Sequence, residues 1–231
     1  GSSDDRLSMG SRPANIALVQ GAQDRRARGL SADLSWNLGP ATVYYLGSHR
    51  ELDQQMVNNY YYRVAPTVAL GVINTYDGAN TQDSHELRIA TNGDGPISAQ
   101  GGLYYFTEES DTSYAFQGLR AVGLPPYYSF PLVTEARSRA AFGQLTWRVR
   151  EDLRLTAGAR RTLDHKWRVG STDFQQGPVF NPALDRRLLN AADLSTARTT
   201  WRLGAEYDVA PATLAYLSLA TGYKAGAFND G

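Results

Sequence analysis

Acidic and histidine side chains are the residues of this 231-residue chain that could bind a metal or move a proton. An acidic run, Glu108, Glu109 and Asp111, could hold a cation through its carboxylate oxygens. None of the three histidines lies at the spacing of paired metal ligands such as HxxxH. Cysteine is absent, which excludes thiolate ligands, disulfides and a cysteine nucleophile. We therefore predict no metal site and interpret the acidic run as solvated.

Enzyme chemistry and nucleic-acid binding have no support in the sequence. No serine lies in a GxSxG context and no phosphate-binding glycine loop is present. The glycine-rich stretch at 92–95 reads Asn-Gly-Asp-Gly, which is typical of a tight turn. The formal net charge is zero, so no basic field favours nucleic acid. We predict a non-enzyme without cofactor or nucleic-acid partner.

Two tyrosine clusters are candidates for ligand binding. Tyr60, Tyr61 and Tyr62 form the first, and Tyr127 and Tyr128 form the second, directly after a proline pair. Both fall in predicted connections between strands. Aromatic side chains on such loops can stack on a ligand ring. The alternative is that they pack the loops against one another.

The elements that position these residues are strands. In the stretch 201–229, apolar residues alternate with polar ones on both sides of a turn at 208–211, which predicts two long strands with one apolar face. Charged residues stand in the middle of the polar face, and a dry sandwich core would not tolerate them unpaired. A strand that is apolar outward and polar inward is typical of a membrane barrel. No apolar run of about 18 residues exists, so we predict no transmembrane helix.

The same unit occurs four times along the chain. The hairpins span about 28–53, 82–109, 136–168 and 201–229, and their tight turns lie near 38, 94, 151 and 210, roughly 56–60 residues apart. Long connections are predicted at about 54–81, 110–135 and 169–196. Short turns at one end and long loops at the other are typical of outer-membrane barrels. The pattern predicts an all-β, antiparallel, up-and-down transmembrane β-barrel meander of about eight strands, part of a larger barrel.

This arrangement predicts the surroundings of two sets of side chains. Aromatic residues on the outward face are predicted to form belts at the two membrane interfaces: Trp36, Trp147 and Tyr207 near the turns, and Tyr105, Trp167 and Tyr223 toward the loops. Charged residues on the other face are predicted to face the barrel lumen: Arg88, Arg148, Arg154, Arg160, Arg202, Glu86 and Glu206. The lumen residues either line a path for an anionic ligand or pair with one another in a wet interior.

Four segments also carry a family resemblance. They are HELRIAT at 85–91, GGLYYFTEES at 101–110, FGQLTWRVREDLRLTAGARRTLDHK at 142–166 and YLSLATGYKAGAFN at 216–229. In this order and spacing they resemble barrel segments of TonB-dependent outer-membrane receptors, in the branch of siderophore and iron-complex receptors. The resemblance covers about 85–231 well and the first hairpin only generally.

The resemblance implies a function and a set of partners. Such receptors have a barrel of about 22 strands with a plug, and they take up a scarce nutrient with energy passed on by TonB. We expect residues 1–231 to be a partial barrel domain, without the plug domain and the C-terminal strands. The expected partners are outer-membrane lipid, a small ligand such as a ferric siderophore, and TonB through a plug absent here. The alternatives are a small passive porin or adhesin barrel and a soluble β-sandwich binding module.

Overall fold

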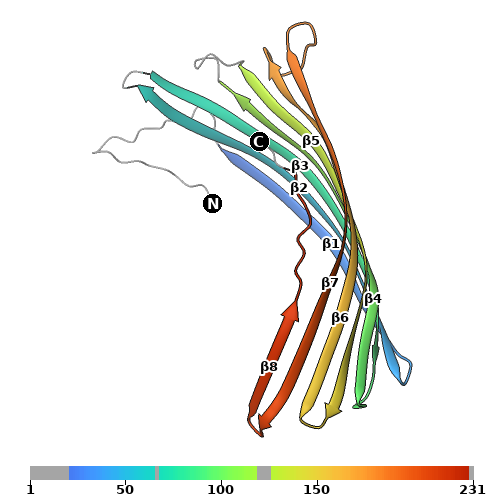
Figure 1. Ribbon diagram of the computed structural model, residues 1–231. Helices are drawn as coiled ribbons and strands as arrows, with labels where there is room; N and C mark the ends of the chain where they lie inside the picture. The colour runs from blue at the N-terminus through green and yellow to red at the C-terminus, as the bar shows by residue number, and fades with distance from the viewer. Residues whose placement is uncertain (1–20, 66–67, 119–125, 229–231) are drawn as a thin grey trace.

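The computed structural model of the protein describes residues 21–65, 68–118 and 126–228. All its regular elements are strands of one antiparallel sheet, in which each strand pairs with the next along the chain (Figure 1). The strands are β1 (Ala22–Asn37), β2 (Ala41–Ala65), β3 (Val68–Thr91), β4 (Ile97–Gln117), β5 (Tyr127–Arg150), β6 (Leu153–Gln175), β7 (Arg186–Ala210) and β8 (Thr213–Ala220). The predicted all-β meander of eight strands is confirmed.

The sheet is single and open. Among the described residues, β1 and β8 each pair with one neighbour, and no second sheet packs on the first. A β-sandwich requires two sheets face to face, so the described fold contradicts that alternative. The eight strands also do not close on themselves as a small porin-type barrel would. None of the described residues forms a helix long and apolar enough to cross a membrane.

Short turns join the strands at one end of the sheet, as predicted. The links are 38–40, 92–96, 151–152 and 211–212. Gly39 and Gly93 adopt φ angles of 89° and 88°, which L-residues with a side chain adopt at a cost. These two glycines therefore allow the tight reversals of the first and second turns.

The prediction of long loops at the other end was wrong. Strands β2 to β7 continue through most of the expected connections, which shrink to 66–67, 118–126 and 176–185. Alternation of apolar and polar residues weakens in these stretches, so the sequence pattern did not indicate strands there. The antiparallel ladder nevertheless continues and pairs the backbone groups of both strands. The strands are consequently far longer than the 9–11 residues or so that cross a membrane.

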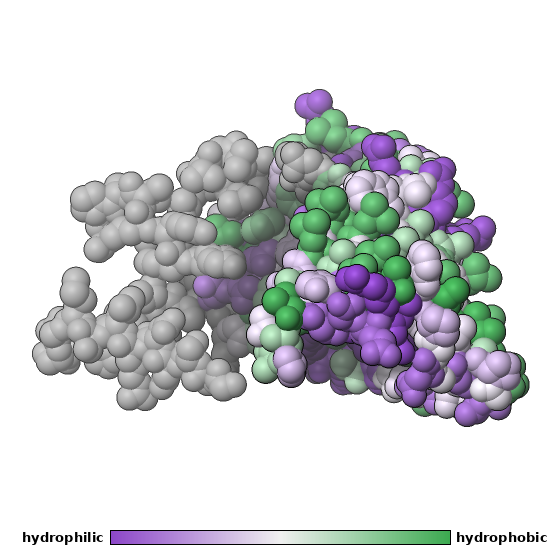
Figure 2. All heavy atoms as spheres, turned by 60° about the horizontal axis from the view of Figure 1, so that its bottom comes forward, coloured by the Kyte–Doolittle hydropathy of each residue, from purple (hydrophilic) through white to green (hydrophobic). Residues whose placement is uncertain are grey.

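The two faces of the sheet differ in chemistry. Odd-numbered positions on β3 to β7 form one face, here called the outer face, which exposes large apolar side chains such as Leu87, Leu103 and Leu203. Even-numbered positions form the concave face, which carries charged and polar residues. Val72 and Ala140 are the buried apolar side chains of the described residues, so the sheet has almost no apolar core of its own. Figure 2 shows the sheet from the end that carries the short turns, where exposed apolar residues lie beside a group of hydrophilic residues.

The apolar part of the outer face has a defined height. On β1 and on β4 to β7 it begins near the turn and ends about eight residues further on, where a polar or amphipathic side chain takes its place. On β2 and β3 it ends sooner, at His49 and His85. The residues at the upper edge of β1 and β4 to β7 are Arg28, Tyr105, Arg139, Arg161 and Thr199. Eight residues span about 26 Å of strand, and membrane barrels expose an apolar band about 25 Å tall. We call this region the apolar band.

The last part of the fourth predicted hairpin differs from expectation. Strand β8 ends at Ala220, and residues 221–228 have no strand assignment. The Tyr223 hydroxyl donates a hydrogen bond to Asp164 Oδ2 at 2.8 Å, and Asp164 lies on the concave face. The prediction of Tyr223 as an outward belt residue was therefore wrong. Once the chain leaves the β7–β8 ladder, side-chain alternation no longer determines its direction, and the phenol finds an inward acceptor.

A side-chain amide joins the first two turns, and this contact gives a first testable prediction. Asn92 Oδ1 accepts a hydrogen bond from Thr42, while Asn92 Nδ2 donates to the Gly39 carbonyl at 2.9 Å and to Asn37 Oδ1 at 3.2 Å. Replacing Asn92 with alanine should reduce the free energy of unfolding by about 1.5 kcal/mol, since three hydrogen bonds are lost and exposed ones contribute near the lower end of about 0.5–1.5 kcal/mol each. Urea unfolding in lipid vesicles measures this change. Asn92→Asp keeps the acceptor and loses both donors, so it should fall between; equal stability of all three proteins would contradict the prediction.

Candidate functional site

Six aromatic rings form a row on the concave face, at the end of the sheet opposite the short turns. The ring centroids of Tyr76 (β3) and Tyr114 (β4) lie 4.5 Å apart. Tyr128 (β5) contacts Phe130 at 4.6 Å and, on the other side, Phe174 (β6) at 4.7 Å, both edge to face. The aromatic row comprises Tyr76, Tyr114, Phe116, Tyr128, Phe130 and Phe174, with Phe116 and Phe130 at 6.2 Å. Four neighbouring strands thus present one aromatic surface.

The rings of the aromatic row are partly accessible. Tyr114 is 44% exposed, and the other five rings are half-buried. The ring of Tyr76 lies over Gly78, where a Cβ atom would collide with its hydroxyl end. Burial raises the pKa of Tyr76, so its hydroxyl remains a hydrogen-bond donor at neutral pH. A surface of exposed rings with hydroxyl donors suits a ligand that has its own rings and anionic oxygens.

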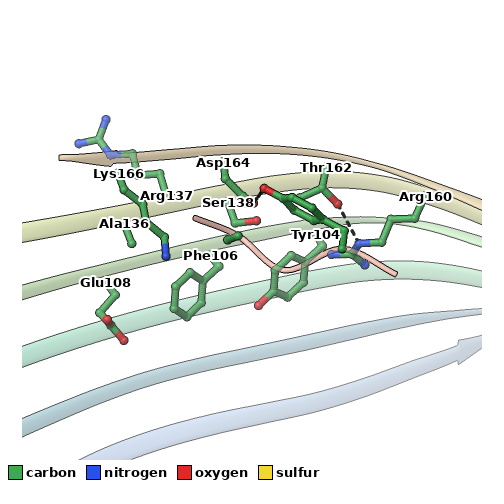
Figure 3. Close-up of a pocket in the computed structure, with 12 residues that line it drawn as sticks. Tyr104, Phe106, Glu108, Ala136, Arg137, Ser138, Arg160, Thr162, Asp164 and Lys166 are labelled. Carbon is green, nitrogen blue, oxygen red and sulfur yellow. Dashed lines mark hydrogen bonds between the residues drawn. The ribbon is translucent and has the colours of Figure 1, made fainter. Parts of the chain in front are cut away.

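A polar pocket lies further toward the middle of the concave face. It encloses about 380 Å³ and is open to solvent. Figure 3 shows side chains from β4, β5 and β6 pointing into it. Its charged residues are Glu108, Arg137, Arg160, Asp164 and Lys166. Arg137 is paired with Glu135, and the other four charges balance, so this pocket by itself favours neither an anion nor a cation.

Arg160 is held in the polar pocket by aromatic rings. Its guanidinium lies over Tyr104 at 5.2 Å and over Phe142 at 5.7 Å, and its Nε donates to Thr162 Oγ1 at 3.2 Å (Figure 3). Cation–π contacts of this kind hold the side chain and leave its charge in place. Arg160 therefore points along the concave face, away from the apolar band.

The other predicted lumen residues also lie at concave positions, in separate groups. Arg88 lies over the Tyr44 ring at 5.0 Å, and Arg148 donates to the Asp94 carbonyl near the turns. Arg202 lines a second opening, and Glu86 lies opposite Tyr104 in the ladder. The structure does not bring these residues together in one site.

Arg154 pairs with two carboxylates near the turn end. Its Nε lies 3.0 Å from Glu206, and its two terminal nitrogens contact both Asp208 oxygens at 2.8 and 3.0 Å. Asp208 was not included in the predicted lumen set. Its even-numbered place beside Glu206 was the signal that could have found it.

The predicted belt residues near the turns occupy the outer face. Trp36, Trp147 and Tyr207 are each exposed by more than 40%. Toward the other end, Tyr105 lies under the Arg139 guanidinium at 5.8 Å, and the Trp167 indole donates to Glu135 Oε2 at 3.0 Å. Their role as membrane belts stays a prediction.

The tyrosine clusters do not lie in loops, which corrects that prediction. Tyr60, Tyr61 and Tyr62 belong to β2, and Tyr127 and Tyr128 begin β5. The side chains of the first three lie outside the described part of the structure. Tyr128 is the one predicted residue that joins the aromatic row.

The sequence interpretation missed the rest of the aromatic row because these stretches were taken as loops. Aromatic residues two positions apart, as in Tyr114–Phe116 and Tyr128–Phe130, were the available signal, since such residues share a face of a strand. Within the described residues, no three His, Asp or Glu side chains gather in a way that could hold a metal ion.

A long open sheet with an apolar band outside and polar side chains inside defines the class of protein as a piece of membrane barrel wall. Comparison with known families then gives a match to the TonB-dependent receptor-like β-barrel over residues 3–231. The chain belongs to this family. A comparison with curated proteins gives no match.

Solved structures of the same fold are siderophore receptors. The ferric yersiniabactin uptake receptor FyuA from Yersinia pestis superposes with a TM-score of 0.69 at 16% identity, over 85% of this chain and 28% of that chain. The ferric-catecholate import receptor Fiu from E. coli K12, open form, gives 0.59 at 12% identity, over 86% and 35%. The siderophore receptor PiuA from Acinetobacter baumannii gives 0.58 at 12% identity, over 86% and 32%. The chain spans about a third of the length of these receptors or less.

Proposed function

We propose that this chain forms part of the barrel wall of a bacterial outer-membrane receptor that takes up an iron complex, energised by TonB. Family membership supports the receptor class, and the siderophore receptors of the same fold support the iron complex. The remainder of the barrel and a plug domain, which would contact TonB, are expected elsewhere in the protein. The concave face would then line the lumen, and the apolar band would contact outer-membrane lipid.

The observation that carries the proposal is the aromatic row. The row lies beyond the upper edge of the apolar band, and in the proposed orientation it would face the outside of the cell, where a nutrient arrives. Partly accessible rings can stack on the flat aromatic groups of an iron chelate. The row spans β3 to β6, so a ligand several rings wide could contact more than one strand. Iron-complex binding by this surface is our proposal for the function of the row.

The test is a double substitution in an intact outer-membrane receptor that carries this chain. Tyr114→Ala with Tyr128→Ala removes two rings of the row, and stacking contributes about 0.5–1.5 kcal/mol per aromatic pair. We expect roughly tenfold weaker binding of a ferric catecholate complex, measured by quenching of intrinsic fluorescence. Uptake of radioactive iron by cells should fall in parallel.

The matched control is Tyr216→Ala. Tyr216 also lies on the concave face and is exposed, but it stands near the turn end on β8, far from the aromatic row. This variant should bind and transport like the wild type. If the double variant keeps wild-type affinity for every iron complex that the receptor transports, the row does not bind ligand. If no iron complex is transported by the wild type, the proposed function itself fails.

A further inference from the structure

Three arginines lie side by side on the outer face, at the upper edge of the apolar band. Arg137 and Arg139 are two positions apart on β5, and Arg161 lies on β6, diagonally opposite Arg139 in the ladder. All three are exposed. We call them the outer arginine cluster. Arg139 and Arg161 occupy outer-face positions and do not line the polar pocket, which Arg137 borders.

Within the outer arginine cluster, the contacts of Arg139 and Arg161 leave their positive charges available for binding. Arg137 pairs with Glu135 on its own strand. Arg139 lies over the Tyr105 ring at 5.8 Å, and Arg161 donates from Nη1 to Thr199 Oγ1 at 3.0 Å. A ring and a hydroxyl orient these two guanidiniums without neutralising them. The two side chains can therefore bind an external anion.

The side chains around Arg139 and Arg161 form an environment that suits a lipid headgroup. Apolar side chains lie beside and below them: Leu103 is 61% exposed and Leu163 is 50% exposed. Carboxylates lie on the side away from the membrane, at Glu109, Glu135 and Asp193. Arg139 stands eight residues above Trp147, and Arg161 stands eight residues above Leu153. The cations thus occupy one narrow layer between apolar band and acidic rim.

We infer that Arg139 and Arg161 bind the phosphate of a membrane lipid in the outer leaflet, whose acyl chains lie over Leu103 and Leu163. Guanidinium groups bind phosphate oxygens through paired hydrogen bonds, and basic groups at the edge of a membrane-spanning surface bind anionic headgroups. The adjoining apolar side chains favour a lipid over a free phosphate, because a free anion would gain nothing from them. Arg137, already paired with Glu135, borders the site on the side away from the short turns. The inference depends on the membrane location of the proposed function, and on no property of its ligand.

Native mass spectrometry of an intact receptor carrying this chain tests the inference. The receptor is released from detergent and titrated with phosphatidic acid, with phosphatidylcholine, or with inorganic phosphate. We expect phosphatidic acid to bind at least tenfold more tightly to the wild type than to Arg139→Gln with Arg161→Gln. Tenfold corresponds to about 1.4 kcal/mol, within reach of two charge-assisted contacts. A variant with lysine at both positions should fall between.

Controls separate the site from general charge effects. Arg26→Gln with Arg150→Gln removes two exposed arginines elsewhere, each paired with a nearby aspartate, and should bind phosphatidic acid like the wild type. Far-UV circular dichroism verifies that every variant is folded. Equal affinity of the glutamine variant and the wild type would overturn the inference. An equal loss of affinity for phosphatidic acid in the control variant would also overturn the inference. Displacement of the lipid by inorganic phosphate at the same concentration would overturn it as well. Because no iron complex is used, the result is independent of the uptake test.

Discussion

Replacing Leu203 with arginine is expected to reduce the stability of the membrane-inserted protein by about 2–4 kcal/mol, the cost of a charged side chain on the lipid face at mid-depth. Leu203 is 50% exposed on the outer face of β7. It lies four residues from Tyr207, near the turn, and four from Thr199, at the upper edge of the apolar band. It is therefore the position where arginine is furthest from either interface.

The matched control is a position of the neighbouring strand at nearly the same height, with its side chain on the other face. Ser218 on β8 pairs with Gly204, next to Leu203, but its side chain lies on the concave face. Arginine at Ser218 meets a polar environment that includes Glu206, so its cost should be well below that at Leu203. Urea unfolding in lipid vesicles, followed by tryptophan fluorescence in an intact receptor carrying this chain, measures both. Equal losses at the two positions would show that the outer face does not contact lipid.

The second large effect is expected at the β6–β7 tip, which comprises the end of β6, the connection 176–185 and the start of β7. Asp173 is 2% exposed, and Arg187 donates to both of its oxygens at 2.8 and 2.6 Å. The Arg187 guanidinium also lies 4.1 Å from the centroid of Phe180. Asp185 accepts the backbone N–H groups of Gln176 and Asn181 and so orders the connection itself. The aspartate–arginine pair therefore joins the two strands at the base of an ordered tip.

Charge on Asp173 stabilises this tip at neutral pH. Burial raises the pKa of Asp173, but the hydrogen bonds from Arg187 and Ser171 and the positive charge of Arg187 outweigh burial, so the pKa is lowered. A lowered folded-state pKa means that the stabilisation is present above the unfolded value of about 3.9 and is lost as the pH falls through the lower folded value. The wild-type tip should thus be stable at neutral pH and open only below about pH 4.

Asp173→Asn should remove this dependence on pH. Hydrogen bonds to charged groups contribute about 1.5–3 kcal/mol, and the lower end applies because Arg187 is half-exposed, so the tip should open roughly tenfold more often at neutral pH. Hydrogen exchange of the backbone amides in 171–190, corrected for intrinsic rates, measures the opening. Asp77→Asn, an exposed aspartate of β3, serves as the control and should leave the tip unchanged. Wild-type protection in Asp173→Asn at neutral pH would rule out a stabilising role for the pair.

Local patterns in the sequence were sufficient to predict the part of the sheet that carries the apolar band. Alternation in 201–210 separates Leu203 from Arg202, because successive side chains of a strand point to opposite faces wherever the strand lies. The turn at 92–95 was predictable because only particular residues adopt its backbone angles. The family resemblance likewise rested on short segments that the family match now covers.

The sequence by itself thus determined the fold class, the face of each strand residue and the positions of the tight turns, since all three depend on residues close together in the chain. The tertiary structure alone decided how far the strands continue and which side chains meet across them. Asp173 and Arg187 are fourteen residues apart, and Tyr76 and Tyr114 are thirty-eight apart, so their contact depends on the register between strands. That register is a property of the whole ladder, in which a shift of one residue would move every side chain to the opposite face.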